Sequence, residues 1–91
     1  MNLPEAFASY SRLFHQDLLK IYPSLDDAVR QAPNFLTRDQ VESLKTYLDE
    51  LTSGRYSNAE LQEIWNSSKA QLYISGGSMI EFFRKARAYL N

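Results

Sequence analysis

The chain offers few side chains for catalysis or for metal binding. Its 91 residues include one histidine, His15, and no cysteine. A cysteine–histidine pair is therefore impossible, and a serine–histidine–acid triad would depend on His15 alone. No segment matches a nucleophile elbow, a phosphate-binding loop or the HExxH helix of zinc hydrolases. We therefore expect no enzymatic activity, no cofactor and no metal site.

Two polar residues stand out because of their place on the predicted first helix. A spacing of 100° per residue puts Asp17 inside the apolar arc, between Tyr10 and Leu13. A carboxylate there needs a hydrogen bond or a cation, since its burial alone is costly. We interpret Asp17 as a buried structural carboxylate, with a partner contact or an acid–base role as alternatives. His15 lies near the edge of the arc and is interpreted as a structural histidine, with a partner contact as the alternative.

The elements that must position these residues follow from apolar periodicity. It predicts helices at roughly 4–21, 25–32, 38–52, 58–68 and 78–90. With no internal repeat and no linker, residues 1–91 are predicted to form one domain. The expected fold is all-α, a compact bundle of four or five helices joined by short loops.

Four helix starts carry Ser or Thr three residues before an acid or Gln, which is the spacing of a capping box. These pairs are Ser24 with Asp27, Thr37 with Gln40, Ser57 with Glu60, and Ser78 with Glu81. The β-prone run 72–74 is too short for a sheet, so we expect a connector that packs Leu72 or Tyr73 onto the core. Gly76 and Gly77 then lead into the last helix, where anion binding at the helix N-terminus is the alternative to a plain loop.

Acidic and basic side chains are concentrated in different parts of the chain. The formal net charge is −1, whereas nucleic-acid binders usually carry a basic surplus. Six acidic residues on the second and third predicted helices, hereafter the acidic set, are candidates for docking onto a basic partner: Asp26, Asp27, Asp39, Glu42, Asp49 and Glu50. The alternative is a solvated face, with some carboxylates favouring a helix N-terminus. Arg84, Lys85 and Arg87 make the last helix basic, which suits its C-terminal dipole, with nucleic-acid or membrane contact as the alternative.

The same composition predicts where the protein works. The absence of cysteine favours a reducing compartment, and residues 1–5 show neither the basic nor the apolar region of a signal peptide. No apolar run approaches the roughly 20 residues that span a bilayer. We therefore expect a cytoplasmic protein that binds neither membranes nor nucleic acid.

Several segments, taken in order, carry a family resemblance. Phe14, His15, Gln16 and Asp17 lie on the predicted first helix, and Tyr22 precedes the run 24–29. Further on come the run 57–61 with Trp65, and then Tyr73, Gly76-Gly77, Phe82-Phe83 and the run 87–90. Together these segments resemble the small α-helical immunity proteins of bacterial contact-dependent growth inhibition systems, whose first helix carries a YFHQDW-like motif. Leu18 stands where that family tends to have tryptophan.

The resemblance implies a cytoplasmic immunity protein whose partner is the C-terminal toxin domain of a large exported effector. Such toxins are often nucleases, which present a basic face to nucleic acid. The acidic set would then dock onto that face and cover about 800 Å² of it. A non-catalytic helical adaptor that binds another protein is the alternative. A helix-turn-helix regulator would need a basic recognition helix, which the third and fourth predicted helices do not supply.

Overall fold

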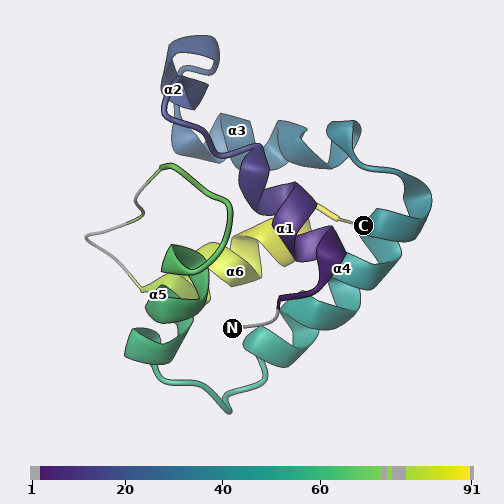
Figure 1. The fold of residues 1–91 in the computed structure, drawn as a ribbon, viewed down its shortest axis with the longest axis vertical. Helices are drawn as coiled ribbons and strands as arrows, with labels where there is room; N and C mark the ends of the chain where they lie inside the picture. The colour runs from purple at the N-terminus through teal and green to yellow at the C-terminus, as the bar shows by residue number, and fades with distance from the viewer. Residues whose placement is uncertain (1–2, 73, 75–77, 91) are drawn as a thin grey trace.

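The computed structural model describes residues 3–72, 74 and 78–90, and the regular secondary structure of this part of the chain is entirely helical. The helices are α1 (Glu5–Arg12), α2 (Leu18–Ile21), α3 (Leu25–Gln31), the 3₁₀ helix η1 (Ala32–Phe35), α4 (Arg38–Leu51), α5 (Asn58–Asn66) and α6 (Met79–Ala88). Figure 1 shows them arranged as a small bundle. The prediction of an all-α bundle is confirmed. None of the described helices combines the length and apolarity that a bilayer crossing requires.

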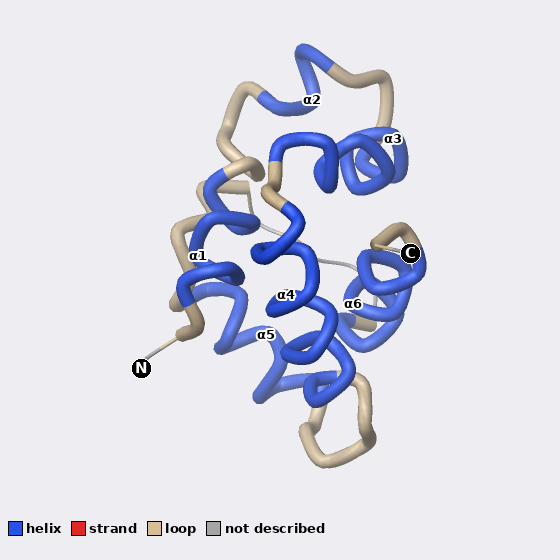
Figure 2. Tube along the Cα trace, turned by 90° about the vertical axis from the view of Figure 1, so that its right-hand side faces the viewer, coloured by secondary structure: helices blue, strands red, loops and turns tan. Residues whose placement is uncertain are grey.

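The helices form a main bundle and a smaller end. In the main bundle, α4 packs against both α1 and α6, and α5 packs against α6. In the smaller end, α3 contacts α2 and η1, and it reaches the bundle by contacting α6. Both views place α2 at the outside of the molecule, with α3 between it and the bundle (Figures 1 and 2). The short helix α2 is therefore supported from one side only.

An aromatic cluster occupies the centre of the bundle. The ring centroid of Trp65 lies 5.2 Å from that of Phe14 and 5.1 Å from that of Phe82, both in edge-to-face geometry. The Trp65 indole Nε1–H donates to the Leu72 carbonyl at 3.1 Å, so its one polar group is satisfied. Leu72 itself packs on the core, as expected for the connector. Tyr73, Gly76 and Gly77 lie outside the described residues.

Two of the four predicted capping boxes are complete. At Thr37 and at Ser57 the side chain accepts from the N3 backbone N–H, and the N3 side chain accepts from the cap backbone N–H. Ser24 accepts from the Asp27 N–H, but its own hydroxyl then donates to the Asp27 carboxylate. Ser78 makes no side-chain cap hydrogen bond, and at the start of α6 the Met79 N–H donates to Asn58 Oδ1 on α5 at 2.6 Å. The cap of α6 thus comes from another helix, which local sequence spacing does not reveal.

The predicted first helix is wrong in one respect: it is two helices. Residues 4–21 break after Arg12, the chain turns through 13–17, and α2 begins at Leu18. The turn is held from outside the helix, because the Phe14 carbonyl accepts from the backbone N–H groups of Gln71 and Leu72, each at 2.9 Å. The buried Ser11 hydroxyl accepts from the Lys69 N–H at 3.0 Å. The segment 69–72 therefore replaces the hydrogen bonds that a continuous helix would have made.

Candidate functional site

The residues of the family-like motif lie in the turn between α1 and α2. Phe14 is fully buried and touches Trp65, while His15 is half-buried and Gln16 is exposed. His15 Nδ1 accepts from the Asp17 backbone N–H at 3.3 Å. A neutral His15 therefore carries its proton on Nε2. The interpretation of His15 as a structural histidine stays a prediction.

The expectation that Asp17 is buried is wrong. Its side chain is 61% exposed and pairs with Lys20 at 3.3 Å. The break after α1 explains the difference, because a straight helix would have carried this carboxylate into the apolar arc between Tyr10 and Leu13. The turn rotates Asp17 into solvent while keeping Phe14 and Leu18 buried. An exposed ion pair of this kind contributes little to stability.

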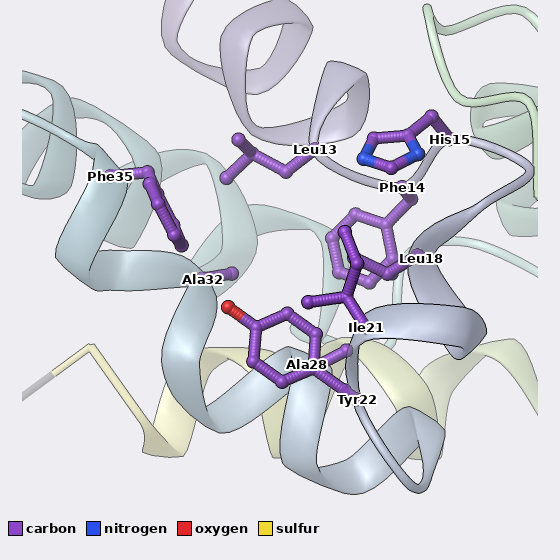
Figure 3. A pocket seen from close by; sticks show the side chains of 9 residues that line it. All are labelled: Leu13, Phe14, His15, Leu18, Ile21, Tyr22, Ala28, Ala32 and Phe35. Carbon is purple, nitrogen blue, oxygen red and sulfur yellow. The ribbon is translucent and has the colours of Figure 1, made fainter.

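An apolar groove lies beside this turn, between the α1–α2 segment and the α3–η1 segment. Its cavity volume is about 210 Å³. Nine residues line it: Leu13, Phe14, His15, Leu18, Ile21, Tyr22, Ala28, Ala32 and Phe35. Figure 3 shows their side chains grouped around one space, with the small Ala32 between Phe35 and the hydroxyl end of Tyr22. The groove exists because the chain turns at 13–17, which holds α2 away from the line of α1.

The exposed apolar side chains of the molecule gather at this end. Among the residues that the structure describes, the large hydrophobic side chains most exposed are Leu19 (48%), Ile21 (63%) and Phe35 (64%). Ile21 and Phe35 line the groove, and Leu19 lies on α2 outside its lining. Soluble proteins rarely leave such side chains together in water unless they serve a contact. Ile21 belongs to the apolar period of the predicted helix 4–21, which favours a buried position, and no pattern in the sequence singles out Phe35.

The acidic set is exposed or half-exposed, and it divides between two helices. Asp26 and Asp27 lie on α3, while the other four lie on α4, opposite its buried leucines. Five of the six have partners within the chain. Asp27 pairs with Arg30, Glu42 with Lys45 at 3.3 Å, and Glu50 with Arg55 at 3.8 Å. Within the described ranges, Asp39 has no such partner.

The basic last helix supplies the remaining two pairs. Lys85 Nζ lies 3.1 Å from Asp26 on α3, and Arg87 Nε lies 2.7 Å from Asp49 on α4. The Tyr89 hydroxyl also donates to Asp26 at 3.2 Å. The hydrogen bond from Lys85 holds the pKa of Asp26 below its usual range, against the opposing effect of desolvation. These bases join α6 to its neighbours, in addition to complementing its dipole.

The described residues hold no grouping of three His, Asp or Glu side chains suited to a metal ion. The one buried polar atom without a hydrogen-bond partner in this part of the chain is the Tyr10 hydroxyl, whose pKa is raised by burial. Comparison with models of protein families, with curated proteins and with solved structures gives no match. The candidate site is therefore defined by its own geometry: an apolar groove whose lining includes Phe14 and His15 of the motif.

Proposed function

We propose that this chain is a cytoplasmic immunity protein, which binds the toxin domain of a contact-dependent growth inhibition effector and covers its working surface. The observation that carries the proposal is the apolar groove. Two residues of the family-like motif, Phe14 and His15, line it, and Ile21 and Phe35 expose apolar surface at its edge. A surface of this kind suits binding to a protein without chemical turnover.

The acidic set has a second role in this proposal. Asp39, Glu42 and Glu50 are exposed along one side of α4. They would face a basic toxin surface, where charge mainly speeds encounter and fixes orientation. Asp26 and Asp49 differ from these three in that they also join α6 to α3 and α4, through Lys85 and Arg87. The apolar groove would supply most of the affinity and the α4 acids most of the association rate.

The proposal predicts a gene for a large exported effector directly upstream of this one, and its test is co-expression with the C-terminal domain of that effector. We expect the two chains to co-purify as a one-to-one complex and expect the cells to survive expression of the toxin domain. Cell death at the same rate with and without this chain, together with failure to co-purify, would refute the proposal. A reaction catalysed by the purified chain alone would refute it as well.

The contribution of charge is tested by the double variant Asp39→Lys, Glu42→Lys. Removing two acids and adding two bases should slow association with the toxin domain at least about tenfold at low salt and much less at high salt. Stopped-flow fluorescence measures both rates. The matched control is Glu63→Lys, an exposed acid on α5, for which we expect a smaller change.

A further inference from the structure

The turn between α1 and α2 depends on one carbonyl group that can serve either of two structures. We propose that residues 5–21 form a two-state switch, in which release of the docked segment 69–72 lets α1 and α2 join into one continuous helix and removes the groove. The switch goes beyond the proposed function and does not depend on it, because it involves contacts within this chain only.

The Phe14 carbonyl is the point at which the two structures exclude each other. It accepts from the backbone N–H groups of Gln71 and Leu72, each at 2.9 Å. A carbonyl oxygen has two lone pairs, and both are therefore occupied. In a continuous helix the same oxygen would accept from the Leu18 N–H, which instead donates to the His15 carbonyl at 3.0 Å. The docked segment and a continuous helix therefore compete for this oxygen.

The sequence of residues 5–22 favours the continuous helix. It contains neither glycine nor proline, which are common causes of a sharp break in a helix. Its apolar period runs through the break, so a continuous helix would bring Ile21, now 63% exposed, onto the apolar face. The helix would also supply acceptors to the N–H groups of His15 and Gln16, which have no hydrogen-bond partner among the described residues.

The broken form is favoured by contacts from outside the helix and by Asp17. Three N–H groups of the docked segment, those of Lys69, Gln71 and Leu72, donate to α1 and the turn. A continuous helix would also carry the Asp17 carboxylate, now exposed, into the apolar arc, where its burial is unfavourable. Each structure thus satisfies groups that the other leaves unsatisfied, as a two-state element requires.

Little apolar surface holds the docked segment in place. Lys69 and Gln71 are exposed, while Ala70 and Leu72 are half-buried against the core. Segments with few buried apolar contacts open at a lower free energy than the whole fold. Release of 69–72 can therefore occur while the main bundle stays folded.

The switch acts on the groove because six of its nine lining residues lie in 13–22. In the continuous helix α2 would move onto the line of α1. The six side chains would then leave their present places around the space that they share with Ala28, Ala32 and Phe35 (Figure 3). The groove therefore belongs to one state of the switch, the state in which segment 69–72 is docked.

Amide hydrogen exchange of the full chain tests the switch. In Asp17→Leu the continuous helix gains an apolar residue in its arc, so the amides of the docked segment should exchange about tenfold faster or more, as expected from burying one leucine. Gln16→Leu is the matched control, because position 16 is exposed and lies outside the arc. Its exchange should change less than about threefold. The Leu48 amide, within α4, reports global unfolding and should change little in either variant.

Gln16→Pro should shift the switch the other way. Residues 15–18 form a type I turn, with a hydrogen bond of 3.0 Å between its ends and with Asp17 at φ −93° and ψ 2°. Proline suits position 16 of this turn, but in a continuous helix it removes an N–H donor and clashes with the preceding turn. The amides of segment 69–72 should therefore exchange more slowly than in the wild type.

Saturation-transfer NMR of the wild-type chain identifies the second state directly. We expect a minor state with helical Cα chemical shifts at residues 13–17, which exchanges together with 69–72 and is lost in Gln16→Pro. Equal exchange of the docked segment in Asp17→Leu and Gln16→Leu would overturn the switch, and so would a minor state with unfolded shifts at 13–17. These measurements use no partner, so they leave the proposed function untouched whichever way they fall.

Discussion

The main bundle and the smaller end built from α2, α3 and η1 use apolar residues in opposite ways. In the bundle, aromatic side chains are buried against one another, as Trp65 is against Phe14 and Phe82. At the smaller end, Ile21 and Phe35 are more than half exposed. Both regions are helical. The difference shows that burial here depends on how many neighbours a helix has, and α2 is covered from one side only.

Among the variants that test this difference between the two regions, Trp65→Ala should have the largest effect on the free energy of unfolding. Trp65 is almost fully buried among four aromatic rings, and its removal should cost about 3–5 kcal/mol of the free energy of unfolding. Urea denaturation followed by circular dichroism measures the loss. Phe35→Ala, at the smaller end, should change stability by less than about 0.5 kcal/mol. Equal losses in the two variants would contradict the division into a core and a free surface.

The next effect concerns the turn that separates the two regions. Ser11→Ala removes the acceptor of the Lys69 N–H and leaves that N–H without a partner beside the buried position 11. We expect a loss of about 1–3 kcal/mol in the free energy of unfolding, measured by urea denaturation. Ser43→Ala, an exposed position on α4, is the control and should change stability by less than about 0.5 kcal/mol. A Ser11→Ala variant as stable as the control would show that the turn does not depend on segment 69–72.

A smaller effect of opposite sign is expected for Tyr10→Phe. The Tyr10 hydroxyl is buried with no hydrogen-bond partner in the described part of the chain, so folding loses its hydration without compensation. Removing the oxygen should raise the free energy of unfolding by up to about 1 kcal/mol. Thermal and urea denaturation together measure the gain. A clear loss of stability would mean that the hydroxyl has a partner, such as an ordered water molecule.

The smallest effect is a pH dependence at the contact between the regions. The pKa of Asp26 is lowered in the folded state by the hydrogen bond from Lys85, so this group stabilises the fold above its unfolded pKa of about 3.9. That stabilisation is lost as the pH falls through the lower, folded value. In thermal denaturation, Asp26→Asn should therefore melt below the wild type at neutral pH, with the difference shrinking in acid. Asp39→Asn should show no such convergence.

The sequence predicts the bundle well because its signals there are local. The apolar stripe of α4, with Leu44, Leu48 and Leu51 buried, follows directly from spacing, and its capping box is complete. The turn at 13–17 could not be predicted in the same way, because the atoms that hold it belong to residues 69–72. The sequence carries one signal of the turn at 13–17, which is the carboxylate at position 17 within an otherwise apolar arc. Such a carboxylate indicates either an unusual burial or the end of a helix. The structure shows the end of a helix.

The candidate site was predictable only in part. Phe14 and His15 of the motif line the groove, whereas Gln16 and Asp17 do not, and the exposed acids of α4 lie opposite the buried leucines of that helix. The pairing of Asp26 and Asp49 with bases of α6 depends on tertiary contacts, which spacing within one helix does not encode. The groove itself was missed because Ile21 continues the apolar period of a helix that the structure ends at Arg12.

The hydrogen bond from Lys69 to Ser11 spans 58 residues of sequence, and this has a consequence for biosynthesis. A nascent chain that has emerged only as far as α4 still lacks segment 69–72 and Trp65, which hold the turn at Phe14 and support one wall of the groove. Such long-range closure is slow compared with the formation of single helices. The groove can therefore take its final form only after residue 72 has been synthesised and has left the ribosome.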